Sequence, residues 1–311
     1  MVIRWGFQNG KQRFRCKNCG QLFTWRNESK HYDQLFVWFS EWILGKQTIN
    51  QLVERSGYSK SKLQRILKHY LETPPVFTIP QKEKVHIILD GTYFSNDICL
   101  VVYRNSDIKC TQLYRLSDNE RYEEIREDLL NLKVLNIQIE SITCDGHRAI
   151  LKAIRSVFRG KVPVQRCLVH IQRMSRIWLT KEPKSIAGKQ LLRITQQIHK
   201  IDSEYKRQEW LRSLYDWDKE HRDFINETSL NPLSGQTWYK HRMLRRVRRL
   251  LINAFPNMFH FLNDNCIPKT TNSLESFFGH LKDNLSIHRG LSQRNRKNFI
   301  KWYMYFRNKS S

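Results

Sequence analysis

The order of short apolar runs between residues 85 and 166 restricts the fold of this 311-residue chain more than any other feature. Three runs come first, KVHIILDGTYF, DICLVVYRN and IKCTQLYRLS, and turn residues separate them. A segment of helical periodicity, YEEIREDLLNL, follows, and then come a fourth apolar run, another helical segment and a fifth run. This order is typical of α/β folds, so the sequence predicts one mixed sheet covered by helices.

Two of these expected strands end in an aspartate that precedes a glycine. Asp90 and Gly91 end the first run, and Asp145 and Gly146 end the fourth. Acids at the ends of neighbouring strands project into one crevice of an α/β sheet. Their carboxylates repel each other unless a divalent cation lies between them, which makes Asp90 and Asp145 candidate ligands.

A third candidate acid, Glu275, lies in the segment PKTTNSLESFFGHLKDNLS. Asn272 or Ser273 can cap a helix here, and Glu275 lies on the flank of its apolar stripe. Gly279 and Lys282 share that side of the helix, which leaves space and positive charge for a phosphate. Each acid also has a structural explanation, because Asp-Gly is common in turns and a glutamate in the first helical turn favours the macrodipole. In combination the three acids predict a site for two Mg²⁺ (or Mn²⁺) ions. The apolar stripe of the expected helix consists of Leu274, Phe277, Phe278 and Leu281.

The net charge indicates a polyanionic partner. Lys and Arg total 54 against 29 Asp and Glu, a formal excess of 25 positive charges. Neutralisation of phosphates makes nucleic acid the expected partner. A ribosomal or membrane-surface protein would also be basic, but 9 Trp, 12 Tyr and many apolar runs favour a large folded protein.

Further features of the sequence indicate a cytoplasmic location. No apolar stretch approaches the roughly 20 residues of a membrane span, and the N-terminal residues lack the apolar core of a secretion signal. The seven cysteines are scattered, which fits reduced thiols. We therefore expect a cytoplasmic, bacterial and nucleoid-associated protein with no membrane partner.

Residues 29–73 are expected to form a helix-turn-helix domain. After the amphipathic segment YDQLFVWFSEWILG, Thr48 can cap a short helix that Gly57 ends, and Ser59 can cap the next one. An ordinary helical hairpin is the alternative. The segment ETPPVFTIP then predicts a linker over residues 74–84. Polar side chains on the second helix are candidates for DNA contact: Lys60, Lys62, Gln64 and Arg65.

Residues 1–28 contain the pair Cys16-x-x-Cys19 followed by Gly20, which is typical of a zinc knuckle between short strands. Tetrahedral zinc requires four ligands, and a complete ribbon would supply another such pair roughly 15 residues earlier. We expect either a start further upstream or a copy that has lost half of its ribbon. Zn²⁺ at Cys16 and Cys19 therefore stays an open expectation for this partial zinc ribbon.

Strand signals disappear after Met174, and helical patterns occupy residues 175–265. The segment HRMLRRVRRLLINAF is amphipathic, with one apolar face and one rich in arginine. The basic face can contact DNA or simply be solvated. The expected apolar face is Met243, Leu244, Val247, Leu250, Leu251 and Ala254. The candidates for DNA contact in this half of the chain are Arg242, Arg245, Arg246, Arg249, Lys282 and Arg289.

Four motifs give the chain a resemblance to a known family. They are LDGTYF around Asp90, CDGHRAI around Asp145, QRCLVHIQR, and KTTNSLESFFGHLKDNLSIHRGLS. Over residues 85–306 the chain resembles DDE-type transposases of the Mutator superfamily, in their bacterial insertion-sequence branch. Its N-terminal segments are similar to the zinc-binding variant of that branch.

The resemblance implies a fold and a place for one more pair of residues. It implies a ribonuclease-H-like catalytic core over residues 85–174 and 266–311, with an all-α insertion at residues 175–265. The strand order also indicates this fold class. The resemblance places Cys167 and His170 in the family's Cys-x-x-His motif, where they support the active site. A buried structural role for this pair, with His170 hydrogen-bonded near the acids, is the alternative.

The function implied is cleavage of insertion-sequence ends and joining of the 3′-OH to target DNA. The resemblance gives Asp90, Asp145 and Glu275 as catalytic residues that hold Mg²⁺, with terminal inverted repeats and target DNA as partners. Synapsis of two ends implies a homodimer or a higher assembly on DNA. Two alternatives stay open, a catalytically inactive or domesticated DNA-binding protein and a ribonuclease-H-like nuclease that recognises the shape of its substrate.

Overall fold

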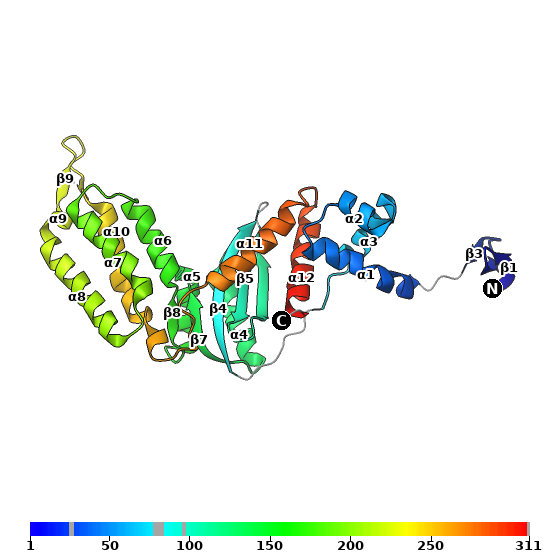
Figure 1. Cartoon of the computed structure of the whole chain (residues 1–311), viewed down its shortest axis with the longest axis horizontal. Coiled ribbons are helices and arrows are strands. Elements are labelled where there is room, and N and C mark those ends of the chain that lie inside the picture. The colour runs from blue at the N-terminus through cyan, green and yellow to red at the C-terminus, as the bar shows by residue number, and fades with distance from the viewer. Residues whose placement is uncertain (25–27, 77–83, 95–97, 310–311) are drawn as a thin grey trace. The chain divides into compact units, whose positions relative to one another are not determined.

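The computed structural model describes residues 1–24, 28–76, 84–94 and 98–309, with only the backbone for residues 28–34. The expected linker at residues 74–84 falls largely outside the described residues. The chain divides into two compact units, the first of residues 1–75 with 284–303 and the second of residues 76–283 with 304–311. Figure 1 shows the elements of both units.

Short strands surround the cysteine pair in the first unit. They form an antiparallel sheet of order β1-β2-β3. Cys16 ends β2, and Gly20 adopts a positive φ of 72° in the turn that follows. The strands are β1 (Val2–Gln8), β2 (Lys11–Cys16) and β3 (Leu22–Thr24).

Helices α1 (Glu28–Leu44), α2 (Ile49–Ser56) and α3 (Lys60–Glu72) continue this unit. The three expected boundary residues are confirmed. Thr48 caps α2 in a reciprocal capping box with Gln51, Gly57 ends α2 with φ 67°, and the hydroxyl of Ser59 accepts from the N–H of Lys62.

The C-terminal helix α12 (Gln293–Lys309) contributes its first part to the same unit. Asn298 Nδ2 donates to Leu71 O at 2.7 Å, and Trp302 Nε1 donates to Tyr70 O at 2.8 Å. The sequence predicts a catalytic core that includes all of residues 266–311, whereas residues 284–303 group with the N-terminal helices. These side-chain bonds to helix-end carbonyls account for the difference.

The second unit contains a five-stranded sheet of order β6-β5-β4-β7-β8. Strands β4, β5 and β6 are antiparallel, and β4, β7 and β8 are parallel. The strand order along the chain agrees with the expectation, but Asp90 does not end its strand, because β4 continues through Phe94 to pair with β5. The strands are β4 (Lys84–Phe94), β5 (Ile98–Asn105), β6 (Thr111–Ser117), β7 (Gln138–Cys144) and β8 (Val164–Arg166).

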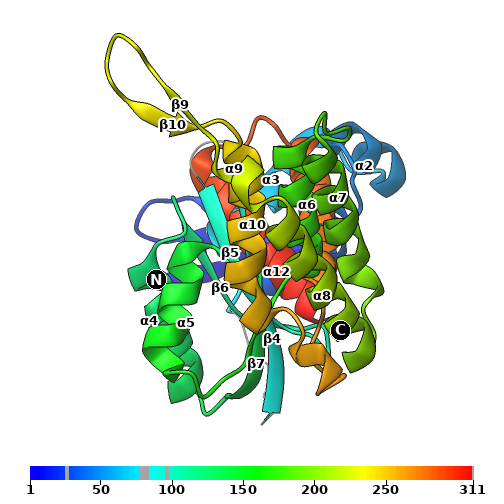
Figure 2. The ribbon, with the colours of Figure 1, turned by 90° about the vertical axis from the view of Figure 1, so that its left-hand side faces the viewer.

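The two faces of this sheet carry different helices. Odd-numbered residues of β4 pack into one apolar core with α4 (Tyr122–Val134) and α5 (Arg148–Phe158), which lie side by side in Figure 2. Side chains alternate along a strand, so the even-numbered residues face the other side. Helix α11 (Asn272–Ser286) lies over that side, where the guanidinium of Arg104 stacks on the ring of Phe277 at 5.0 Å.

The segment after β8 forms a second apolar core within this unit. The expected all-α insertion is wrong in one respect, because β9 (Thr228–Leu230) and β10 (Thr237–Tyr239) form a hairpin that projects from the helices in Figure 2. The helices are α6 (Leu168–Leu179), α7 (Ile186–Gln197), η1 (Ile198–Lys200), α8 (Glu204–Glu220), α9 (Arg222–Asn226), α10 (Arg242–Ala254), η2 (Phe255–Asn257) and η3 (His260–Leu262).

Helix α10 of this core shows the expected amphipathic pattern with two exceptions. Met243 is 47% exposed and Leu250 is half-buried, so neither belongs to the fully buried face. That face consists of Leu244, Val247, Leu251 and Ala254.

A helix that crosses a bilayer needs roughly 20 predominantly apolar residues. Among the described residues, no helix is both long enough and apolar enough to cross a membrane.

Candidate active site

Asp90 lies on β4, and Asp145 directly follows the adjacent strand β7. Leu89 of β4 pairs with Cys144 of β7 in the parallel ladder. Asp90 follows Leu89 and Asp145 follows Cys144, so the two aspartates leave the ladder side by side. Asp90 is only 6% exposed and accepts a hydrogen bond from the N–H of Gly91 at 2.9 Å. Burial raises the pKa of Asp90 to about 7, and repulsion from Asp145 adds to this increase.

The glycines that follow the two aspartates give space to neighbouring side chains. A Cβ on Gly91 would overlap the carboxylate of Glu120, and one on Gly146 would overlap the guanidinium of Arg166. Gly146 also has a positive φ of 88°. Arg166 donates to the backbone carbonyl of Asp145 at 3.1 Å, so the space at Gly146 allows a contact that holds this turn.

Glu275 reaches the aspartates from α11. One ligand atom each of Asp90, His170 and Glu275 lies within 4.8 Å of the others. Arg173 Nη2 donates to Glu275 Oε2 at 2.9 Å, and His170 Nδ1 lies 3.6 Å from Oε1. Asp145 lies outside this 4.8 Å cluster among the described residues, although its charge acts on Asp90. The structure thus brings Asp90 and Glu275 together and places Asp145 beside Asp90.

Cys167 and His170 lie at the start of α6 beside these acids. The N–H of Thr271 donates to Cys167 Sγ at 3.3 Å, and its hydroxyl oxygen lies 3.5 Å from the same sulfur. Burial favours the neutral thiol, but hydrogen bonds from His170 and Thr271 outweigh it and lower the pKa of Cys167. The bond to Cys167 is the largest effect that raises the pKa of His170 to about 9, and Asp90 and Glu275 add to it. His170 is therefore a cation at neutral pH.

The helix cap differs from the expectation. The carbonyl of Thr271 accepts from the N–H groups of Leu274 and Glu275, so Thr271 precedes the helix, and Asn272 is its first residue. Thr271 is fully buried and contacts Cys167. The position of Glu275 is thus tied to the Cys-x-x-His segment through Thr271.

A fourth acid, Glu120, was not found by the sequence reasoning. Its side chain is 10% exposed and its carboxylate lies 3.3 Å from His147 Nδ1. Burial, followed by repulsion from Asp145, raises the pKa of Glu120, and His147 opposes this increase. Glu120 lies before α4, outside any expected strand or motif, so no signal in the sequence marks it. Its place in the site is seen only from its carboxylate packing against Gly91.

Comparison with protein families gives a match over residues 96–277, more than half of the chain, to the model described as Transposase IS66 family. The chain belongs to the IS66 transposase family. The matched region includes Asp145, Cys167, His170 and Glu275, whereas Asp90 lies before its first residue. A comparison with curated proteins found no match.

Membership of the IS66 family changes part of the expectation from the motifs. The match supports an insertion-sequence transposase. It does not support the Mutator superfamily or its zinc-binding variant.

The N-terminal cysteines of this IS66-family chain have part of the geometry of a zinc knuckle. Backbone N–H groups of Cys19 and Asn18 lower the pKa of the Cys16 thiol, as in a thiolate turn. Cys16 and Cys19 are both free thiols. Over residues 1–24, 28–76, 84–94 and 98–309, neither belongs to a group of three potential metal ligands.

The residues expected to contact DNA differ in their exposure. On α3, Lys62 is half-buried with its Nζ 3.6 Å from the centre of the Tyr58 ring. On α10, Arg248 is bound to Asp218, while other arginines line an open pocket of about 500 Å³. The exposed candidates are Lys60, Gln64, Arg65, Arg242, Arg246, Arg249, Lys282 and Arg289, and Arg245 is half-buried over Tyr239.

The carboxylates have the donor chemistry that Mg²⁺ requires. Mg²⁺ binds oxygen ligands and is usually held by one or two carboxylates, waters and phosphate. Burial, and then repulsion from Asp145, raise the pKa of Asp90, and a bound cation would offset both effects. His170 and Arg173 lie beside Glu275 and balance its charge. The residues present therefore fit a divalent-cation site.

The raised pKa of Asp90 predicts that the metal-free protein loses stability as pH rises. The unfolded chain releases this proton near pH 4, whereas the folded chain keeps it until about pH 7. The free energy of unfolding thus falls across this window. We expect Asp90→Asn to reduce the loss between pH 5 and pH 8 by about 2–3 kcal/mol, measured by urea unfolding with a chelator present. An equal loss in both proteins would show that Asp90 ionises normally.

Proposed function

We propose that the chain is a DDE-type DNA transposase, which cleaves the ends of an insertion sequence and joins the freed 3′-OH to target DNA. Its membership of the IS66 transposase family supports DNA transposition. The observation that carries the proposal is the approach of Glu275 on α11 to Asp90 on β4, with Asp145 directly after the adjacent strand β7. In this proposal, acids from β4, from the turn after β7 and from α11 would form a single oxygen-rich centre.

The strand order supports a ribonuclease-H-like catalytic core. Three antiparallel strands followed by two parallel ones, with helices between them, give the order β6-β5-β4-β7-β8. The β4–β7 pairing ends at Leu89 and Cys144, so Asp90, within β4, and Asp145, just after β7, follow the last paired residues. The helical segment after α6 would be the insertion that separates this sheet from α11.

In this proposal Asp90, Asp145 and Glu275 hold two Mg²⁺ (or Mn²⁺) ions. Bound there, the ions supply activation of the attacking water or 3′-OH and stabilisation of the leaving oxygen in an in-line displacement. Burial of Asp90 at 6% exposure excludes water from one side of the centre. Thr271, through its contacts with Cys167, fixes the start of the helix that presents Glu275.

The cations beside the acids would act on the DNA backbone. His170 carries a positive charge at neutral pH and lies 3.6 Å from Glu275 Oε1. Arg173 is about half exposed and can hold a phosphate by its planar guanidinium once the carboxylate binds an ion. These two side chains thus neutralise Glu275 in the absence of an ion and phosphate in its presence.

Other surfaces would hold the terminal inverted repeats and the target DNA. The helices α2 and α3 would act as a helix-turn-helix, with the exposed residues Lys60, Gln64 and Arg65 towards DNA. The arginines of α10, with Lys282 and Arg289, would contact phosphates. Two ends must be joined in one event, so a homodimer or higher assembly on nucleoid DNA in the cytoplasm is part of the proposal. Cys16 and Cys19 would supply two of the four ligands of a Zn²⁺ ion.

Recognition of the ends separates the transposase from its alternatives. The purified full-length protein is incubated with Mg²⁺ and labelled DNA that carries the gene's own flanking ends or the same bases scrambled. We expect nicking at the end boundary, about 1,000-fold faster on the native ends, and joining of the 3′-OH to a plasmid. Equal cleavage of both substrates would indicate a shape-selective nuclease, and specific binding without cleavage would indicate a DNA-binding protein.

A further inference from the structure

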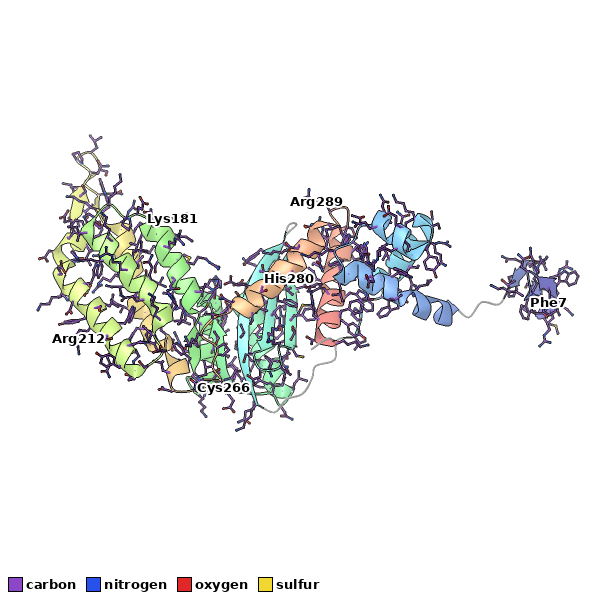
Figure 3. All side chains as sticks on the ribbon, viewed as in Figure 1. Phe7, Lys181, Arg212, Cys266, His280 and Arg289 are labelled. Carbon is purple, nitrogen blue, oxygen red and sulfur yellow. The ribbon has the colours of Figure 1, made fainter. Side chains whose placement is uncertain are left out.

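A second group of potential metal ligands lies outside the candidate active site. It consists of His86 on β4 and of Asp264 and Cys266 in the loop between η3 and α11. One ligand atom from each residue lies within 4.8 Å of the others. Figure 3 labels Cys266 in this loop. The three donors, an imidazole nitrogen, a carboxylate oxygen and a sulfur, differ from the oxygen-rich set around Asp90.

We propose that His86, Asp264 and Cys266 bind a transition-metal ion of the Zn²⁺ class. A ligand set with nitrogen, oxygen and thiolate sulfur suits Zn²⁺ and disfavours Mg²⁺. Two ligands of one tetrahedral Zn²⁺ lie about 3.3–3.8 Å apart, given bonds of about 2.0–2.3 Å. The ligand atoms lie within 4.8 Å of one another, a limit wider than this spacing, so in the proposed site the side chains would close onto one ion, with water as the fourth ligand.

His86 already has a hydrogen-bond partner on β7 for one of its ring nitrogens. Its Nδ1 lies 2.8 Å from the hydroxyl of Ser141, the residue that it pairs with across the parallel β4–β7 ladder. Ser141 is fully buried, so this contact fixes the ring. Metal-bound histidines usually make such a hydrogen bond with the nitrogen that does not bind the ion. Nε2 is therefore the nitrogen available for the metal.

The loop that supplies the other ligands is held in place by its backbone. Asp264 Oδ1 accepts from the N–H of Cys266 at 2.9 Å, which leaves Oδ2 for an ion. The hydroxyl of Thr143 on β7 donates to Pro268 O at 2.9 Å, and the N–H of Leu168 on α6 donates to Lys269 O at 3.1 Å. The ligands thus come from a strand and from a loop whose geometry is set independently of any metal.

The place of this group gives the ion a structural role. His86 and Asp90 lie four residues apart on the same side of β4, a separation of about 13 Å. Asp264 and Cys266 precede the helix that carries Glu275. An ion at this second group would therefore fasten the segment that leads to Glu275 to the strand that carries Asp90. The binding itself does not depend on the proposed function.

Binding of Co²⁺ as a spectroscopic substitute for Zn²⁺ tests the proposal. The full-length protein with Cys16→Ser and Cys19→Ser, which removes the N-terminal thiols, is stripped with a chelator under reducing conditions. We expect a thiolate-to-cobalt charge-transfer band that saturates at one Co²⁺ per chain and that Zn²⁺ abolishes. Cys266→Ser should remove the band, and His86→Ala should weaken binding by more than about 100-fold.

Two variants separate this group from its surroundings. Ser141→Ala removes only the hydrogen bond to the imidazole and should weaken Co²⁺ binding by about 10–100-fold. Glu275→Gln changes the candidate active site and should leave both the band and the affinity unchanged. A band that persists in Cys266→Ser, or that Glu275→Gln abolishes, would overturn the assignment.

Alkylation of Cys266 gives a second measurement on the protein with all of its cysteines. Cys266 is exposed, so iodoacetamide reacts with it, and mass spectrometry of its peptide gives the rate. We expect Zn²⁺ to slow this reaction at least 10-fold in the wild type and not in His86→Ala. The same rate with and without Zn²⁺ in the wild type would contradict the proposal.

Discussion

Glu275→Gln is expected to slow strand cleavage by more than about 100-fold while DNA binding stays within a few-fold of the wild type. Loss of residues that only orient a metal ligand costs about 10–100-fold in activity, and removal of the ligand itself should cost more. The amide keeps the shape of the carboxylate but not the charge that Asp90, His170 and Arg173 surround. Gel-based cleavage rates and binding isotherms on the same end DNA measure the two effects.

The matched control for this substitution is Glu123→Gln. Glu123 also lies in the first turn of a helix, α4, but it is exposed and outside the acid cluster. Its cleavage rate should equal that of the wild type. Because Arg173 is about half exposed, loss of its partner at Glu275 should cost less than about 1 kcal/mol of stability. A cleavage rate in Glu275→Gln like that of the control would remove Glu275 from the mechanism.

Gly146→Ala is expected to lower the free energy of unfolding by about 3 kcal/mol. The positive φ of 88° strains any residue with a Cβ. The added methyl group also overlaps the guanidinium of Arg166, which is only 8% exposed, so this end of the side chain must shift within a packed region. Displacement of Arg166 also removes its bond to the carbonyl of Asp145, so cleavage should fall too. Urea unfolding of the metal-free protein gives the free energy.

Gly160→Ala separates the two causes. Gly160 has a similar φ of 80°, but nothing lies within 4 Å of the added Cβ. It should cost only the backbone strain, about 1 kcal/mol. Equal losses in both variants would show that the contact with Arg166 contributes nothing.

Local sequence rules predicted those parts of the fold that depend on neighbouring residues. Thr48, Gly57 and Ser59 end or begin helices as expected, because a cap needs only residues within one turn. The order of the five central strands was predictable for a similar reason, since each is a short apolar run. The hairpin of β9 and β10 was missed because each strand has three residues and little burial.

The surroundings of the acids depend on tertiary packing and could not be predicted. Arg173 lies 102 residues from Glu275, and Thr271 lies 104 residues from Cys167. Glu120 enters the site only because Gly91 lacks a side chain. Asp90 was expected at the end of its strand, but β4 continues to Phe94 because it pairs there with β5. Only the pairing with β7 ends next to Asp90, and the sequence of β4 alone does not show where a partner strand ends.

The most direct test of the central claim compares the two acids that flank Asp90. Cleavage of native end DNA with Mg²⁺ is measured for the wild type, Asp145→Asn and Glu120→Gln, with DNA binding measured in parallel. If Asp90, Asp145 and Glu275 form the catalytic centre, Asp145→Asn loses cleavage by more than about 100-fold and keeps binding, and Glu120→Gln still cleaves. Cleavage that survives in Asp145→Asn and disappears in Glu120→Gln would contradict the assignment.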